Sequence, residues 1–237
     1  MIDPEDYKLH IFDLDDTLVN TSYSYTIAQE SAIRDTFPQI PSDAITALLP
    51  VLKWMCRQFG SGNISEYMSA FLKSRPDLFA VDSDILELIL DRYKCSFNTE
   101  FKCFNGAISY IQYLKKTDKK LALVSNGIVA SQFEKLRTTG LDSFFPAPLC
   151  YISGAYPSNF KKPSPHMLEQ ACQYVGVSPP EVVFYGNSVG DILAGNLAGV
   201  TTVHFSESTP IPGDLPAIAR PDYTIENWTE LMDFKKG

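Results

Sequence analysis

The stretch IFDLDDTLVNTS (residues 11–22) sets three aspartates, Asp13, Asp15 and Asp16, directly behind the apolar run LHIF at 9–12. Carboxylates this close together repel one another unless a cation or hydrogen-bond donors surround them. Two interpretations fit the stretch on its own: the acids cap a following helix, or they share a divalent cation. The second interpretation needs partner residues from elsewhere in the chain.

Short apolar runs recur beyond the first one, and each is nearly continuous rather than alternating. They lie at 121–124, 149–152, 182–185 and 200–203. This pattern is typical of strands buried on both faces, as in a parallel sheet covered by helices. The segments between the runs carry helical periodicity. We therefore predict an α/β fold with a doubly wound parallel sheet.

One long interval breaks the alternation of strands and helices. Its apolar residues recur at helical spacing, in the segments 42–59, 64–74 and 83–93. We therefore predict a small α-helical domain at 20–100, inserted into a core made of 1–19 and 101–237. A bundle inserted after the first strand is expected at the carboxyl edge of the sheet, where open α/β sheets bind ligands.

The composition bounds the class of protein. The chain of 237 residues has a net charge of −8 and is 45% hydrophobic, so it is acidic and has ample apolar mass for a core. An acidic chain repels a phosphate backbone, and we expect no nucleic-acid partner. The polar start at 1–8 and the absence of a long apolar run predict no signal peptide and no membrane partner. The odd number of cysteines, without C-x-x-C spacing, favours a reducing, cytoplasmic location. The sequence specifies no oligomeric state.

The position of the acids suggests a division of labour. Asp13 is the first residue beyond the predicted strand at 9–12, and Asp15 faces the same side if the backbone stays extended. One carboxylate can then act as a nucleophile while the other donates and accepts protons. A magnesium ion, which binds carboxylate and backbone carbonyl oxygens, makes their repulsion tolerable.

Polar residues also follow the next predicted strands. Ser125 and Asn126 come directly after 121–124, where a hydroxyl and exposed N–H groups can cradle a phosphate. Lys162 stands before a proline at the start of a predicted helix and can neutralise an anion. Both positions are expected at the carboxyl edge of the sheet.

The turn after 182–185 completes this set, because it holds Asn187 and Asp191 and opens a predicted helix. In a parallel sheet all these clusters share one edge. Independent helix caps would rarely supply a nucleophile, a hydroxyl, a lysine and metal-ligand types in that order. The sequence therefore favours the shared cation over simple capping.

Taken in order, the segments FDLDDTL, LALVSNG, KKPSP and GNSVGDILAGNLAG resemble the four motifs of the haloacid dehalogenase superfamily. The likeness extends over essentially the whole chain. It is strongest to phosphatases with a helical cap inserted after the first strand, the phosphoglycolate phosphatase-like branch. The resemblance implies a Rossmann-like core, Mg²⁺ dependence, and hydrolysis of a small phosphorylated metabolite through an aspartyl-phosphate.

The resemblance also assigns roles to residues. Asp13 is the implied nucleophile, and Asp15 is the implied acid and base. The implied phosphate-binding residues are Thr17, Ser125, Asn126 and Lys162, with Lys162 preferred over Lys161 because the family lysine directly precedes the proline. The implied metal ligands are Asp13, the backbone carbonyl of Asp15, Asn187 and Asp191.

The sequence departs from the family pattern at Asn187, where an aspartate is common. A neutral amide oxygen is a weaker ligand for magnesium, and either Asn187 or Asp191 can be the direct ligand. The presence of Asp15 favours phosphatase over dehalogenase chemistry. A phosphomutase and a weakly active phosphate-ester-binding regulatory protein remain alternatives.

The substrate is left open among sugar phosphates, phosphoglycolate and nucleoside monophosphates. Its candidate contacts are Tyr23, Tyr25 and the loop at 156–160.

Overall fold

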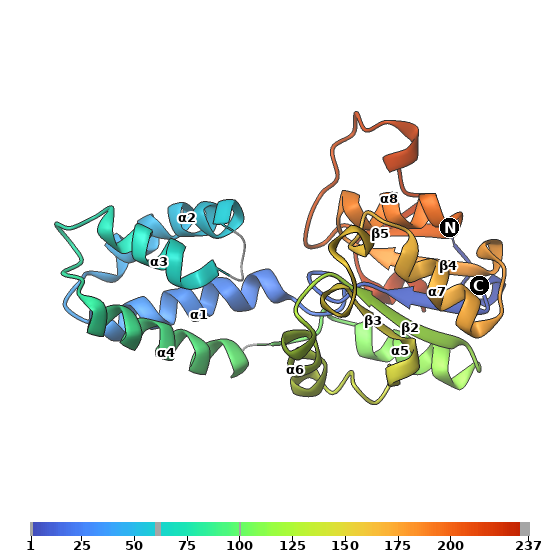
Figure 1. The fold of residues 1–237 in the computed structure, drawn as a ribbon, viewed down its shortest axis with the longest axis horizontal. Coiled ribbons are helices and arrows are strands. Elements are labelled where there is room, and N and C mark those ends of the chain that lie inside the picture. The colour runs from blue at the N-terminus through green and yellow to red at the C-terminus, as the bar shows by residue number, and fades with distance from the viewer. Residues whose placement is uncertain (1, 60–62, 100, 233–237) are drawn as a thin grey trace. The chain divides into compact units, whose positions relative to one another are not determined.

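The computed structural model describes residues 2–59, 63–99 and 101–232. The chain divides into two compact units: Met1–Asn20 with Lys102–Gly237, and Thr21–Phe101. The first unit contains the sheet, and the second is built from helices (Figure 1).

Six strands in the described residues form one parallel sheet in the order β3-β2-β1-β4-β5-β6. They are β1 (Leu9–Phe12), β2 (Lys120–Ser125), β3 (Cys150–Ile152), β4 (Val182–Gly186), β5 (Thr201–Phe205) and β6 (Tyr223–Ile225). The chain winds outward from β1 in both directions, which confirms the predicted α/β fold with a doubly wound sheet. The apolar runs mark five of these strands. The edge strand β6 reads Tyr-Thr-Ile, and the polar Thr224 at its centre interrupts any continuous apolar run.

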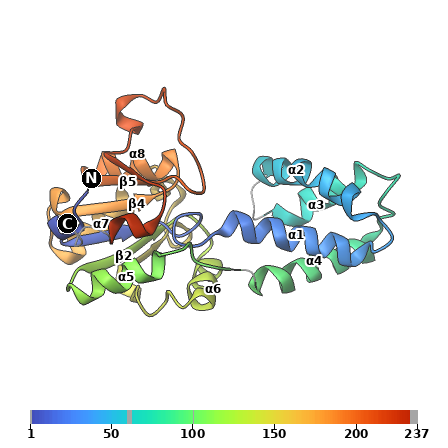
Figure 2. The same ribbon diagram turned by 180° about the vertical axis from the view of Figure 1, so that it is seen from behind.

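Helices cover both faces of this sheet (Figure 1). They are α5 (Ala107–Lys116), α6 (Val129–Thr139), α7 (His166–Val175), α8 (Val189–Ala198) and the short η8 (Trp228–Leu231). Helices α7 and α8 pack on the face that carries Leu9 and Ile11, whereas α5 and η8 pack side by side on the face that carries Phe12 (Figure 2). The strands are therefore buried on both faces, as their continuous apolar runs predict.

Glycines end α7 and α8 and turn the chain back toward the sheet. Gly176 and Gly199 follow the two helices with φ of 76° and 72°, a left-handed conformation that glycine adopts without steric cost. Strands β4 and β5 follow soon after. Because β1 pairs in parallel with both β2 and β4, the carboxyl ends of these three strands lie at one edge of the sheet.

The second unit is a bundle of four helices in the described residues: α1 (Thr21–Thr36), α2 (Ser42–Phe59), α3 (Ile64–Lys73) and α4 (Ser83–Thr99). Helices α1 and α4 run antiparallel and side by side, and α2 packs on α3 (Figure 1). Its apolar core includes Ile33, Phe71 and Ile89, which are fully or almost fully buried. The unit therefore has a hydrophobic core of its own. Across the residues that the structure describes, no helix combines the length and apolar character needed to cross a membrane.

A buried histidine lies in the middle of the sheet. His10 of β1 is inaccessible to solvent, and its Nδ1 lies 3.1 Å from the Tyr185 hydroxyl, which in turn lies 2.6 Å from the Tyr110 hydroxyl. The Nε2 atom of His10 is buried without a hydrogen-bond partner among the described residues. Burial lowers the pKa of His10 to about 3, and the nearby Lys119 acts in the same direction.

We expect His10 to make the fold sensitive to acid. Because its folded pKa lies below that of the unfolded chain, its stabilising effect is complete above about pH 6.5 and declines as the pH falls toward 3. Substituting His10→Phe should make the drop in the free energy of unfolding between pH 7 and pH 5 smaller by about 2 kcal/mol. Urea unfolding at both pH values measures this, and an equal drop in both proteins would refute it.

Candidate active site

The site is built at the carboxyl edge of the sheet, beginning with Asp13. Its backbone N–H donates to the Tyr185 carbonyl at 2.9 Å, which continues the ladder between β1 and β4 and fixes the start of the loop. The side chain is 5% exposed. Its Oδ2 accepts a hydrogen bond from the Thr17 hydroxyl at 3.1 Å, and Thr17 Oγ1 also lies 3.4 Å from Asn187 Oδ1.

Lys162 joins two of the predicted site acids. Its Nζ lies 2.6 Å from Asp13 Oδ1, 2.7 Å from Asp191 Oδ1 and 2.9 Å from the Val124 carbonyl. The ammonium is buried, and a buried charge is stable only when it is paired in this way. The neighbouring Lys161 is exposed, so Lys162 is the lysine that joins this cluster.

Asn126 places Lys162 there. Its side-chain Oδ1 accepts from the Lys162 N–H, and its Nδ2 donates to the Lys162 carbonyl, both at 3.0 Å. Its amide is thus engaged with the backbone of Lys162. Ser125 is fully buried, and its Oγ accepts from Gln132 Nε2 at 2.7 Å.

The turn after β4 is shaped around Asp191. The Asp191 carboxylate accepts from the N–H and hydroxyl of Ser188 in a capping box that starts α8. A Cβ on Gly186 would lie 2.3 Å from Asp191 Cβ, so only glycine leaves room for this carboxylate. Asn187 donates from Nδ2 to Thr209 Oγ1 at 3.3 Å, which turns its Oδ1 toward Thr17.

The charges at this edge are out of balance. Burial raises the pKa of Asp13 to about 7; Lys162 opposes this effect, whereas Asp191 and Asp15 add to it. Burial acts to lower the pKa of Lys162, but Asp13 and Asp191 raise it. Two buried carboxylates therefore share one buried ammonium, an arrangement that further positive charge would stabilise.

The donors at this edge suit a hard cation. They are oxygens: those of Asp13 and Asp191, the Asn187 amide and the backbone carbonyl of Asp15. In the part of the chain that the structure describes, no three His, Cys, Asp or Glu side chains form a metal-binding group. An oxygen set of this kind fits magnesium, which needs few carboxylates and keeps phosphate and water as further ligands.

Asp15 is held by α6, a contact that the sequence analysis does not predict. Its Oδ1 pairs with Lys135 Nζ, and its Oδ2 accepts from Gln132 Nε2 at 2.7 Å. The next residue, Asp16, has φ of 57°, in the left-handed region that favours glycine. Its carbonyl accepts from the Ser208 hydroxyl at 2.6 Å.

The candidate substrate contacts have partners within their own units. Tyr25 stacks on Tyr93 and Phe97 in the helical unit, and Tyr23 on α1 is about half exposed. In the core unit, the Phe160 ring stacks on His166 with centroids 3.7 Å apart.

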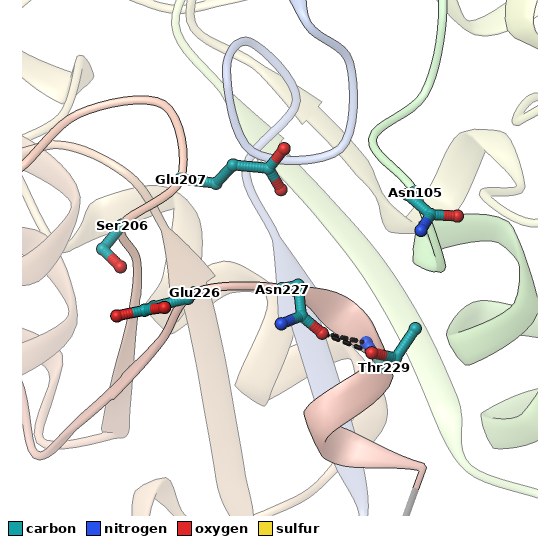
Figure 3. Close-up of a pocket in the computed structure, with 6 residues that line it drawn as sticks. All are labelled: Asn105, Ser206, Glu207, Glu226, Asn227 and Thr229. Atoms are coloured by element: carbon teal, nitrogen blue, oxygen red, sulfur yellow. Dashed lines mark hydrogen bonds between the residues drawn. The ribbon is translucent and has the colours of Figure 1, made fainter.

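A surface pocket of about 580 Å³ lies elsewhere on the core unit (Figure 3). It is lined by Asn105, Ser206, Glu207, Glu226, Asn227 and Thr229. None of these is a predicted site residue, and the six include two carboxylates but no cationic side chain that could hold a phosphate. The cluster around Asp13, and not this pocket, is therefore the candidate active site.

The chain is similar to known proteins over most of its length. The family model described as haloacid dehalogenase-like hydrolase matches residues 10–205. The chain belongs to this family. The family predicted from the four motifs is thus confirmed, and so is the prediction that the chain is a hydrolase.

Curated relatives of this haloacid dehalogenase-like hydrolase match along most of its length. It is 27% identical over 228 residues to glyceraldehyde 3-phosphate phosphatase of Pyrococcus furiosus, covering 95% of this chain and 92% of the relative. It is 25% identical over 240 residues to phosphoglycolate phosphatase of Mannheimia succiniciproducens, covering 95% and 97%. A pyrophosphatase, PpaX of Listeria welshimeri, is 25% identical and covers 94% and 93%.

Solved structures share the fold of this hydrolase. A putative β-phosphoglucomutase from Thermotoga maritima superposes with a TM-score of 0.70 at 20% identity, covering 95% of this chain and 97% of the other. The putative hydrolase YfnB from Bacillus subtilis, described as bound to magnesium, gives 0.65 at 24% identity, covering 95% and 96%.

Proposed function

We propose that this haloacid dehalogenase-like hydrolase is a magnesium-dependent phosphatase of a small phosphorylated metabolite, and that Asp13 forms an aspartyl-phosphate. The observation that carries the proposal is the buried cluster of Asp13, Lys162 and Asp191 at the carboxyl edge of the sheet. The names of the curated phosphatases, two for small phosphorylated metabolites and one a pyrophosphatase, support it.

In the first step, an Asp13 oxygen attacks phosphorus, and the bond between phosphorus and the ester oxygen breaks. The leaving alkoxide takes a proton from the Asp15 carboxyl group. The Lys162 ammonium and the Ser125 hydroxyl hold the phosphoryl oxygens, because positioning and charge stabilisation supply most of the catalysis in phosphoryl transfer.

In the second step, water attacks phosphorus and the bond to Asp13 breaks, which releases inorganic phosphate. Asp15, now a carboxylate, accepts the proton of the attacking water. Thr17 keeps the Asp13 carboxylate in place through its hydrogen bond to Oδ2. The chain is thus returned to its starting state.

Magnesium would be held by Asp13, the Asp15 carbonyl, Asn187 and Asp191. When bound, it offsets the negative charge that the substrate phosphate and Asp13 bring together. The magnesium reported for the Bacillus subtilis neighbour supports this choice of ion.

The helical unit, Thr21–Phe101, is proposed to act as the cap that selects the substrate. It interrupts the core directly after the loop that carries Asp13 and Asp15, where an inserted unit can cover the ligand edge of an α/β sheet.

We place the enzyme in the cytoplasm, because all five cysteines, each in the described residues, are free.

A panel of phosphorylated metabolites tests the proposed function. It should include 2-phosphoglycolate, glyceraldehyde 3-phosphate, sugar phosphates, nucleoside monophosphates and pyrophosphate, each with Mg²⁺ and with EDTA. We expect release of inorganic phosphate from at least one ester, and loss of the activity in EDTA. Transfer of phosphate between sugar positions without release would instead indicate a mutase, and no turnover of any ester would contradict the enzyme.

Asn187 offers a prediction about metal affinity. Substituting Asn187→Asp adds a charged ligand to the site, and we expect the dissociation constant for Mg²⁺ to fall by about tenfold or more. Isothermal titration calorimetry of the EDTA-treated protein measures it. The variant Asn105→Asp, which makes the same change at an exposed position of the core unit, is the control. An unchanged constant in Asn187→Asp would remove this residue from the proposed ligands.

A further inference from the structure

Helix α6 directs two buried polar side chains at Asp15. Gln132 is 1% exposed and Lys135 is 4% exposed, and together with Leu136 they are the buried residues of this helix. They are three residues apart and so lie on the same helical face. Lys135 contacts Asp15 Oδ1, and Gln132 donates to Oδ2 at 2.7 Å. Because each carboxylate oxygen has its own partner, the rotation of the carboxylate is fixed. Each oxygen keeps a second lone pair, which can carry the proton that Asp15 donates and accepts.

The Gln132 amide has one workable orientation. Its Nε2 lies 2.7 Å from Ser125 Oγ and 3.2 Å from the Asn126 carbonyl, in addition to Asp15. Its Oε1 is buried and finds no donor within the described ranges, which costs stability. The reversed amide would face its carbonyl oxygen against the Asp15 carboxylate. This orientation of Gln132 therefore supplies a hydrogen bond to the Asp15 carboxylate and leaves the Gln132 carbonyl oxygen without one.

Packing holds the glutamine in this orientation. A Cβ on Gly127 would lie 2.8 Å from Gln132 Nε2 and 2.9 Å from its Cδ, so the side chain lies flat against the backbone of the loop after β2. Gln132 thus links the Asp15 carboxylate to Ser125, which is in the proposed phosphate-binding loop. A helix that only covered the sheet would have no use for a buried lysine here, because an apolar side chain would avoid the cost of burying its charge.

We propose that Gln132 and Lys135 are positioning residues that hold the Asp15 carboxyl group for both of its proton transfers. This inference rests on the function proposed above. In the first step Asp15 must meet the leaving oxygen as the ester bond breaks, and in the second it must meet the attacking water. A carboxyl group free to rotate would satisfy these geometries less often. The protonation of the leaving group should therefore depend on α6.

Two aryl phosphates that differ in their leaving group test this inference. Phenoxide is a poorer leaving group than p-nitrophenoxide, so phenyl phosphate depends more on an acid than p-nitrophenyl phosphate does. In the full-length protein with Mg²⁺, we expect Lys135→Met to lower kcat/KM for phenyl phosphate by about 100-fold and for p-nitrophenyl phosphate by about tenfold or less. The second variant, Gln132→Leu, should show the same inequality.

A double-mutant cycle separates positioning from support of the fold. In an Asp15→Asn background, Lys135→Met should cause no further loss in kcat/KM, because the residue acts through Asp15. The control is Arg137→Met, which removes an exposed charge from the same helix and should leave both esters unaffected.

Equal losses on the two esters in both variants, or a further loss in the Asp15→Asn background, would overturn the inference. These outcomes differ from a failure of the proposed function. That failure would show as no Mg²⁺-dependent hydrolysis of either ester by the wild type, or as activity retained by Asp13→Asn.

Discussion

Substituting Asp13→Asn is expected to lower kcat by about 10⁴-fold or more, because an amide oxygen is a poor nucleophile and forms no stable bond to phosphorus. The change is nearly isosteric. It removes one of the two carboxylates that share Lys162, the one whose pKa burial raises to about 7. The fold should therefore be retained or stabilised.

Phosphate release from the best substrate of the panel, with and without the substitution, measures this effect. Urea unfolding of both proteins checks the fold. The matched control is Asp214→Asn, which makes the same chemical change at an exposed position and should keep full activity. Activity within about tenfold of the wild type in Asp13→Asn would contradict the assignment of the nucleophile.

Substituting Lys162→Met is expected to damage both activity and stability. The loss of a cation beside the phosphoryl group should lower kcat/KM by about 10³-fold. It also leaves Asp13 and Asp191 buried without their shared ammonium, which should cost about 3 kcal/mol of unfolding free energy. Adding Asp13→Asn should restore part of that stability without restoring activity.

Lys161→Met is a close control, because it removes the adjacent lysine, which is exposed. We expect its unfolding free energy to stay within about 0.5 kcal/mol of the wild type. Urea unfolding and kcat/KM on the same substrate compare the two variants. If Lys161→Met is the more damaging of the pair, the placement of Lys162 at the site is wrong.

The edge of the sheet at which the proposed site lies could be predicted from the sequence. Continuous apolar runs mark strands buried on both faces, and the polar residue after each run falls at the carboxyl edge of a parallel sheet. This rule brings Asp13, Ser125 and Asn187 together although they are far apart in the chain. Strand β1 even begins and ends at the predicted residues, 9 and 12.

The partners of these residues could not be predicted, because they depend on how neighbouring elements pack. Gln132 and Lys135 reach Asp15 only through the orientation of α6 against the loop after β1. The available signal was the spacing of Gln132 and Lys135, which lie three residues apart on a helix that also buries Leu136. This spacing does not predict a contact with Asp15, because helices carry such residues on exposed faces too. Thr209 orients Asn187 from a loop with no recognisable pattern.

Asn126 illustrates a difference between residue type and role. Its position after β2 predicts a phosphate contact, whereas both polar atoms of its side chain bind the backbone of Lys162. The phosphate-binding role of Asn126 therefore stays a prediction for its backbone N–H. The loop after β2 and the loop before α7 are joined by this residue, which explains how a lysine so distant in the chain meets Asp13.

The most direct test of the account is to trap the covalent intermediate. The protein is mixed with Mg²⁺ and its best substrate, quenched in acid within one turnover, digested and analysed by mass spectrometry. We predict that the peptide containing Asp13 gains the mass of one phosphoryl group and that Asp13→Asn abolishes this gain. With p-nitrophenyl phosphate, whose leaving group needs little help from an acid, Asp15→Asn should increase the phosphorylated population by slowing the second step. Two results would contradict the central claim. One is release of phosphate without any phosphorylated peptide, and the other is a phosphoryl group on a residue other than Asp13.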